Sequence, residues 1–171
     1  VEITDVTPEL RRRVKAMSYG LAYGLSAYGL ASQLKISTEE AKGQMDQYFA
    51  RFGGVRDYLQ SVVEQARKDG YTSTVFGRRR YLPELDSSNR QVREAAERAA
   101  LNAPIQGSAA DIIKVAMINV DKALRDAELK SRMLLQVHDE LLLEIADGER
   151  DRVEELIRDK MGSAFPLDVP L

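Results

Sequence analysis

Residues 11–24 read RRRVKAMSYGLAYG, and in this stretch Arg11, Lys15, Tyr19 and Tyr23 follow one another at steps of four. In a helix, residues spaced by four lie along one face. The stretch therefore predicts a helix whose face carries two cations followed by two aromatic rings. A nucleoside triphosphate would be contacted in that order, by cations at its phosphates and by flat rings at its sugar and base. A solvated helix face with snorkelling tyrosine side chains accounts for the same spacing, so both interpretations stay open at this point.

The composition is that of a folded protein. The chain has 171 residues, of which 44% are hydrophobic and 30% charged, and it contains no cysteine. This length allows a hydrophobic core of useful size, and the absence of cysteine excludes a disulfide framework or a thiolate metal site. Nothing resembles a signal peptide, and no apolar run approaches the length of a membrane span. We therefore expect a cytoplasmic protein without a membrane partner.

The net charge of −2 conceals an asymmetry along the chain. The basic residues cluster early and in the middle, at Arg11–Arg13 with Lys15, at Arg78–Arg80, and at Arg90, Arg93 and Arg98. Acidic residues crowd the end of the chain, between Asp139 and Asp159. A polyanion fits the basic part, whereas the acidic part would repel a polyanion or hold cations.

The chain reads as helices first and as mixed structure later. Capping and hydrophobic patterns predict, in order, helices at 8–23, 26–35, 38–53 and 55–69, an extended segment at 71–76, a basic turn at 77–83, helices at 89–102 and 108–129, strands at 133–137 and 141–145, and a helix at 149–161. Pro104 is expected to end the helix before it. The predicted fold class is α+β and mostly helical, with a boundary near residues 76–82.

His138, Asp139 and Glu140 separate the two apolar runs that form the predicted hairpin. Clustered carboxylate oxygens are suitable ligands for Mg²⁺, with waters and substrate phosphates completing its shell. Charged residues at a hairpin turn are also ordinary, so the turn alone does not establish a metal site.

Arg98, Asn102 and Gln106 form a second set spaced by four. Guanidinium and amide donors can contact the acceptors that every base pair presents in the minor groove. These side chains could therefore hold duplex DNA without reading its sequence. A polar helix face with intrahelical pairs, such as Glu94 with Arg98, explains the spacing equally well.

Taken together, the motifs resemble those of family A DNA polymerases, the bacterial DNA polymerase I type. Arg11 to Gly24 is similar to motif B of the fingers subdomain, and residues 136–140 (QVHDE) are similar to motif C of the palm. Residues 74–83 and 97–107 match the intervening sequence blocks in order and spacing. The resemblance covers nearly the whole chain. It implies a helical fingers subdomain at 1–76, then part of a palm at 77–171 with its hairpin at 132–145, truncated at the C-terminus.

The resemblance also implies an activity: template-directed DNA synthesis in replication and repair, from dNTPs on a primer–template. Under it, Arg11 and Lys15 hold the nucleotide phosphates and assist catalysis, while Tyr19 and Tyr23 contact the nucleotide. The implied DNA contacts are Tyr23, Gly24, Arg98, Asn102, Gln106 and His138. Asp139 is the implied catalytic metal ligand and Glu140 a weaker one, in a two-metal Mg²⁺ site.

A two-metal phosphoryl transfer requires carboxylates from two places. The second aspartate of this family lies in motif A, which we do not find in residues 1–171. We therefore expect this chain to need the thumb and the rest of the palm as partners, and to be inactive alone. The alternatives are a fragment of a single-subunit RNA polymerase and a non-catalytic nucleic-acid-binding module.

Overall fold

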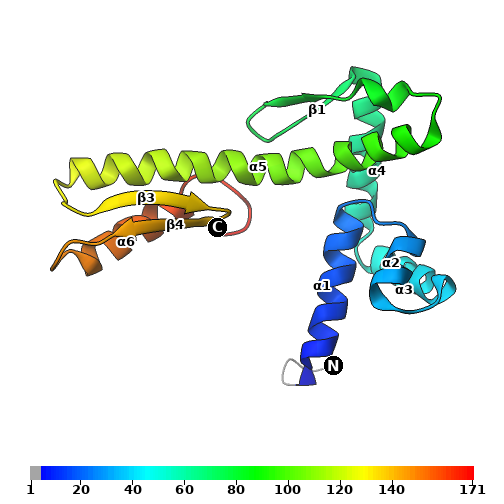
Figure 1. Ribbon diagram of the computed structural model, residues 1–171, viewed down its shortest axis with the longest axis horizontal. Coiled ribbons are helices and arrows are strands. Elements are labelled where there is room, and N and C mark those ends of the chain that lie inside the picture. The colour runs from blue at the N-terminus through cyan, green and yellow to red at the C-terminus, as the bar shows by residue number, and fades with distance from the viewer. Residues whose placement is uncertain (1–4) are drawn as a thin grey trace. The chain divides into compact units, whose positions relative to one another are not determined.

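The computed structural model describes residues 5–171, and the chain divides into two compact units. The first unit holds the residues up to Ser73 together with Gly77–Ile105, and the second holds Thr74–Phe76 and Gln106–Leu171. Figure 1 shows the elements of both units along the chain. The division of the chain into fingers at 1–76 and palm at 77–171 stays a prediction.

Four helices begin the first unit, as the sequence predicts. They are α1 (Pro8–Ala22), α2 (Ala27–Leu34), α3 (Thr38–Arg51) and α4 (Gly53–Asp69). Each of the first three begins with a hydroxyl that accepts a hydrogen bond from a backbone N–H in the first turn: Thr7 from Leu10, Ser26 from Gly29 and Ser37 from Glu40. These caps satisfy donors that a helix start leaves without intrahelical partners, and they explain why local sequence predicted the starts well.

Two small cores hold this unit together. Leu30, Ala31 and Ala41 are buried between α2 and α3. A second cluster joins α4 to the segments that follow it, and its buried members are Ala66, Leu82, Leu85, Ala96 and Ala100. The small alanine side chains of this second cluster allow its elements to pack closely.

The prediction of a basic turn at 77–83 is wrong in part, because this segment contains a strand. Strand β2 (Arg79–Tyr81) pairs antiparallel with β1 (Tyr71–Ser73), and the 3₁₀ helix η2 (Pro83–Asp86) follows. The pairing places Tyr81 opposite Tyr71 with ring centroids 5.6 Å apart. Cross-strand aromatic pairs stabilise such ladders, and three consecutive arginines conceal that propensity in the sequence.

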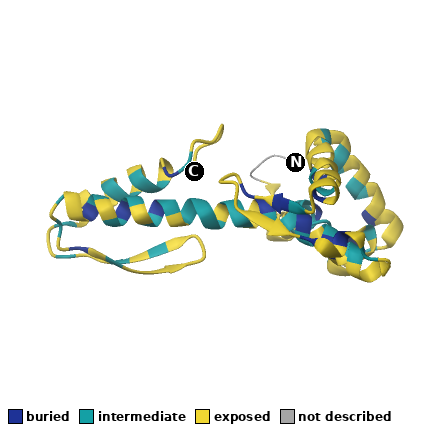
Figure 2. Ribbon diagram, turned by 90° about the horizontal axis from the view of Figure 1, so that it is seen from above, coloured by how far each residue is buried: buried dark blue, intermediate teal, exposed yellow. Residues whose placement is uncertain are grey.

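The predicted break at Pro104 is also wrong, because α5 (Arg90–Asp126) continues through it. Proline removes the N–H that would bond to the carbonyl of Ala100, at a cost of about 3 kcal/mol. Packing on both sides of Pro104 offsets this loss. Ala96 and Ala100 are buried before it, and Ala116 and Val120 after it, and Figure 2 shows buried residues recurring along α5.

The second unit contains the predicted hairpin and the last helix. Strands β3 (Arg132–Val137) and β4 (Glu140–Glu144) pair antiparallel, and α6 (Arg150–Gly162) follows. Its core is Val120, Leu124 and Val153. The α+β, mostly helical fold class is thereby confirmed. Among the described residues, no helix is long and apolar enough to cross a membrane.

Candidate nucleotide and nucleic-acid site

The face of α1 that the sequence singled out is largely open to solvent. Arg11, Lys15 and Tyr19 are exposed, and the Lys15 ammonium lies 5.7 Å from the centroid of the Tyr19 ring. At this distance a cation interacts favourably with the ring. Tyr23 is half-buried and ends the helix, with its N–H bonded to the Tyr19 carbonyl at 3.1 Å. The stripe is therefore present as predicted, with its cations toward the helix start.

A cavity of about 530 Å³ opens beside this stripe in the first unit. This volume falls in the range of small-ligand sites. The cavity brings together four predicted site residues, namely Lys15, Tyr19, Tyr23 and Arg98. Arg12 and Gln33 also line it, whereas Arg11 does not. Sequence reasoning missed Arg12 and Gln33, since neither lies on the four-residue stripe.

Arg98 reaches this cavity from α5 and is not neutralised by an acid. The alternative interpretation paired it with Glu94, but Glu94 bonds to Arg90 at 2.6 Å. That hydrogen bond is the main reason why the pKa of Glu94 lies below its usual value, and the charges of Arg90 and Arg98 lower it further. Within residues 5–171, no carboxylate forms an ion pair with Arg98. Its guanidinium is therefore available to an anion or to an acceptor on a ligand.

Gly24 explains how α1 and α5 come close enough to share this cavity. Its φ of +73° is in the left-handed region that side chains disfavour. A Cβ at this position would lie 2.8 Å from Cδ1 of Leu101 and 3.5 Å from Cγ of Arg98. The absence of a side chain thus permits the close approach of the end of α1 to α5.

One turn after Arg98 on α5, the side chain of Asn102 has an unsatisfied acceptor. Its Oδ1 is buried and has no hydrogen-bond partner among the described residues. Buried polar atoms without partners are uncommon in folded proteins. The sequence predicts Asn102 as a donor to the minor groove through its amide NH₂ group. In the structure, the oxygen of the same amide accepts no hydrogen bond.

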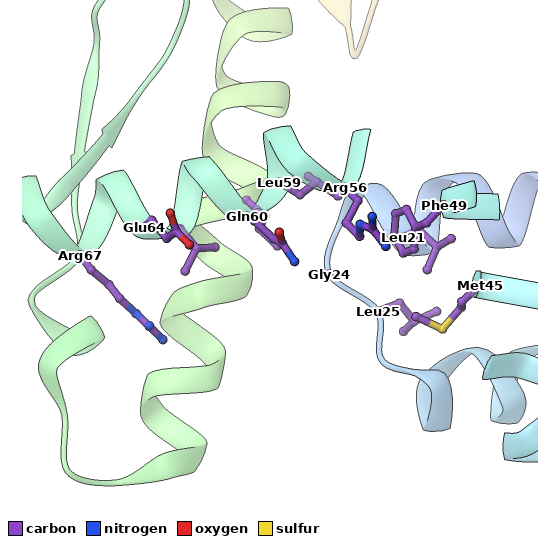
Figure 3. Close-up of a pocket in the computed structure, with 12 residues that line it drawn as sticks. Leu21, Gly24, Leu25, Met45, Phe49, Arg56, Leu59, Gln60, Glu64 and Arg67 are labelled. Carbon is purple, nitrogen blue, oxygen red and sulfur yellow. The ribbon is translucent and has the colours of Figure 1, made fainter. Parts of the chain in front are cut away.

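A further cavity, of about 510 Å³, lies at the end of α1, where Leu21 and Gly24 line it (Figure 3). Apolar side chains including Leu21, Met45 and Phe49 surround one part of it, and Gln60 and Arg67 extend into it from α4. Gly24 is the one predicted site residue among those that line it. Four predicted site residues therefore line the first cavity, against one here.

In the second unit, the predicted motif at the hairpin turn adopts a strained local geometry. Val137 pairs with Glu140, so His138 and Asp139 alone form the turn. His138 has a φ of +54°, which favours glycine, and the Gln136 side chain donates a hydrogen bond to its carbonyl. Strain at a non-glycine residue is common at functional sites.

Asp139 is exposed at this turn and also borders a cavity of about 650 Å³. The other residues that line the cavity are mainly apolar side chains of α5 and α6, such as Ile112 and Ile157. A carboxylate at the edge of an apolar surface keeps its solvent-facing oxygens free for a ligand.

The carboxylates of Asp139 and Glu140 are of the type that Mg²⁺ prefers. Within the described part of the chain, no group of three or more candidate ligands forms a metal site. Asp139 and Glu140 thus stand at and beside the turn without a third candidate ligand among the described residues.

The structure thus gathers Lys15, Tyr19, Tyr23 and Arg98 at one cavity, with Gly24 at the contact between helices. Arg11 is on the same helix but outside the lining, and Asn102 is one turn from Arg98. The remaining predicted residues, Gln106, His138, Asp139 and Glu140, belong to the second unit.

Comparison with known proteins agrees with the motifs. The family model for DNA polymerase family A matches residues 1–171. DNA polymerase I of Mycobacterium leprae is 83% identical over 171 residues, covering 100% of this chain and 19% of the relative. DNA polymerase I of Mycobacterium tuberculosis is 85% identical with the same coverage, and that of Caldicellulosiruptor bescii is 49% identical over 100% of this chain and 20% of the relative.

A solved structure is also very similar. It is the POL domain of Pol1 from M. smegmatis in complex with DNA primer-template and dNTP, with a TM-score of 0.97 and 82% sequence identity. The match covers 100% of this chain and 30% of that chain. Our chain spans about a fifth of the length of the curated relatives, 19% in the M. leprae protein. On these matches, the chain belongs to DNA polymerase family A.

Proposed function

We propose that the protein containing this chain transfers nucleotides from dNTPs to a primer 3′-OH under the direction of a DNA template, in replication and repair. The observation that carries this proposal is the shared cavity of Lys15, Tyr19, Tyr23 and Arg98 in a chain of DNA polymerase family A. The neighbouring solved structure is a complex with DNA primer-template and dNTP, which supports this choice of substrates. A cytoplasmic location belongs to the same proposal.

In this proposal, α1 holds the incoming nucleotide. Lys15 and Arg11 bind its phosphates and stabilise the charge that develops on the leaving group. Tyr19 lies against the sugar and triphosphate, and Tyr23 at the position of the templating base. Without nucleotide, the Lys15 ammonium lies over the Tyr19 ring, 5.7 Å from its centroid. In the complex, the ammonium exchanges this contact for one with the nucleotide phosphates.

The primer–template is held from α5 and from the hairpin turn. Arg98, Asn102 and Gln106 follow at steps of four along α5 and donate to the minor groove. The guanidinium of Arg98, which forms no ion pair within residues 5–171, supports this role. Gly24 lets α1 approach this helix, and His138 contacts the primer terminus.

Asp139 is the catalytic carboxylate of this chain, with Glu140 in support. When bound, Mg²⁺ would polarise the phosphoryl oxygens and lower the pKa of the attacking hydroxyl. The exposed Asp139 carboxylate would hold that ion from one side, and an aspartate elsewhere in the polymerase from the other. The helical residues 1–76 form the fingers and residues 77–171 part of the palm.

The proposal is tested by substitution of Asp139 in the intact polymerase. We expect Asp139→Asn to lower kcat for primer extension by about 100-fold or more, because the amide cannot hold a divalent cation as a carboxylate does. DNA affinity should remain near that of the unsubstituted enzyme. Removal of divalent metal with EDTA should abolish extension in both proteins.

A matched control is Asp147→Asn, since Asp147 is another exposed carboxylate of the second unit. It should leave kcat unchanged. An intact protein that binds DNA but never extends a primer would contradict the proposal and favour a binding module. Preference for ribonucleotides over deoxynucleotides would contradict it in favour of an RNA polymerase.

A further inference from the structure

The β1–β2 hairpin of the first unit has one anchored face and one open face. Thr72 is 8% exposed, and Leu82, directly after β2, belongs to the buried cluster with Ala66. The Leu82 N–H also donates to the Gly70 carbonyl at 2.9 Å, which closes the base of the hairpin. The backbone of this short hairpin is therefore fixed to α4, and its open face is presented on a rigid support.

The open face carries two tyrosines and an arginine in contact, and the two rings are tilted by 58° to each other. Because directly paired residues share a face, Tyr71 with Tyr81 and Ser73 with Arg79 lie together. The Arg79 guanidinium lies 4.4 Å from the centroid of the Tyr71 ring, and the two tyrosine rings are 5.6 Å apart. A hydrogen bond to Tyr81 is the main cause of the raised pKa of Arg79. We call Tyr71, Arg79 and Tyr81 the hairpin platform.

The platform is open to solvent. Tyr81 is 67% exposed, although it is a large aromatic side chain. Within residues 5–171, no carboxylate forms an ion pair with Arg79 or Arg80. The guanidinium of Arg79 has five N–H donors, so its stacking and its bond to Tyr81 leave donors free. Asp69 acts on Arg79 only through its charge, without an ion pair. An aromatic face beside such a cation is a surface on which nucleobases stack while a phosphate is held.

A small cavity continues this surface. It has a volume of about 320 Å³ and borders on Tyr71, Tyr58, Gln65 and Asp69. Gln65 donates to Asp69 at 2.6 Å, so this wall presents amide and carboxylate groups. Such groups can bond to the edge of a base, and the Tyr58 and Tyr71 side chains supply aromatic faces.

We infer that the hairpin platform binds single-stranded DNA, with bases stacked on Tyr81 and Tyr71 and a phosphate held by Arg79. This site is separate from the cavity of Lys15 and Tyr19, with which it shares no lining residue. Duplex DNA hides its base faces, so the platform selects single strands. The inference rests on the proposed function for the source of its ligand, an unpaired stretch of DNA.

The test uses the intact polymerase and a fluorescein-labelled oligodeoxythymidylate of about 12 nucleotides, within the span of known single-strand sites. An unlabelled primer–template with a short overhang is present at saturation, so that the primer–template site is filled. Fluorescence anisotropy then reports the remaining single-strand binding. We expect Tyr81→Leu to weaken this binding by about 5- to 100-fold, because leucine offers no π-face. Tyr81→Phe, which retains the ring, should change it by less than about 2-fold.

Arg79→Gln should weaken binding and lower the slope of log affinity against log salt by about 1. Tyr28→Leu is the matched control, since Tyr28 is 76% exposed on α2 and should leave binding unchanged. Primer extension on the short-overhang template should persist in Tyr81→Leu, which also shows that this variant folds.

The inference would be overturned by unchanged affinity in Tyr81→Leu, by an equal loss in Tyr81→Phe, or by loss in Arg79→Gln alone, which indicates simple charge attraction. Tighter binding of duplex than of single strand by the platform would overturn it also. Absence of extension in the unsubstituted polymerase would instead contradict the proposed function, so the two failures are distinguishable.

Discussion

Gly24 has the backbone geometry on which the candidate nucleotide cavity depends. Its positive φ ends α1, and its missing side chain leaves room for Leu101 of α5. Arg98 enters the cavity from that same helix. A single residue without a Cβ therefore allows residues from two distant parts of the chain to share one site.

We expect Gly24→Ala to destabilise the first unit by roughly 1–3 kcal/mol, because the left-handed backbone strains any side chain. The contact at 2.8 Å with Leu101 adds to this cost. Nucleotide affinity should fall as α1 moves away from α5. Urea unfolding of the intact polymerase, followed by a probe in this unit, measures the first effect, and equilibrium dNTP binding measures the second.

Gly54→Ala is the matched control, since an added Cβ there meets nothing within 4 Å. It lies in α4, where alanine is a better helix former than glycine. The free energy of unfolding of Gly54→Ala should equal or slightly exceed that of the unsubstituted protein. Equal stability of both variants would contradict the role that we assign to Gly24.

Among the elements, the β3–β4 hairpin is closed by one carboxylate. Glu149 accepts from the backbone N–H of Lys130 at 3.0 Å, from that of Ser131 at 2.9 Å, and from the Ser131 hydroxyl at 2.6 Å. The Ser131 hydroxyl in turn accepts from the Ala146 N–H at 3.0 Å. These bonds join the start of β3, the end of β4 and the residue before α6. The pKa of Glu149 is lowered mainly by the hydrogen bond from the Lys130 N–H and next by that from the Ser131 hydroxyl.

Folding lowers the pKa of Glu149, so its carboxylate stabilises the hairpin fully at pH values above the ordinary glutamate pKa of about 4.3. This stabilisation is lost as the pH falls through the lowered pKa of the folded protein. We expect protection of the 130–131 amides from hydrogen exchange, corrected for intrinsic rates, to decrease in that acidic range. In the intact polymerase at neutral pH, Glu149→Ala should already show faster exchange there. Glu155→Ala, at an exposed position of α6, is the control and should leave the exchange of these amides unchanged. Protection that is equal in Glu149→Ala and the unsubstituted protein would contradict this role.

At the scale of the whole molecule, the proposed catalysis needs more carboxylates than the described residues bring together. Its candidate metal ligands are Asp139 and Glu140, and within residues 5–171 no third carboxylate completes a metal site. Phosphoryl transfer with two metals requires carboxylates from another place. Under the proposed function, we expect the rest of the polymerase to supply them.

We expect the purified 171-residue chain to extend no primer, even at high concentrations of Mg²⁺ and dNTP. Circular dichroism should accompany the assay, because a helical spectrum shows that inactivity does not reflect unfolding. The intact polymerase under the same conditions is the positive control. Templated extension by the purified chain would contradict this prediction.

The sequence by itself determined the elements whose signals are local. Thr7, Ser26 and Ser37 cap their helices through contacts within one turn, and the two apolar runs around His138 and Asp139 pair as neighbouring strands across a short turn. The four-residue spacing also placed Lys15, Tyr19 and Tyr23 on one face, since helix geometry is the same in every fold.

The tertiary structure alone decided the features that depend on distant partners. Strand β2 forms because Tyr81 meets Tyr71 across the ladder, and α5 passes through Pro104 because its flanks are packed in buried clusters. Arg98 of α5 shares a cavity with α1 only because Gly24 admits α5. The free energy of such contacts comes from burial between segments far apart in the chain, and no local pattern of residues contains it.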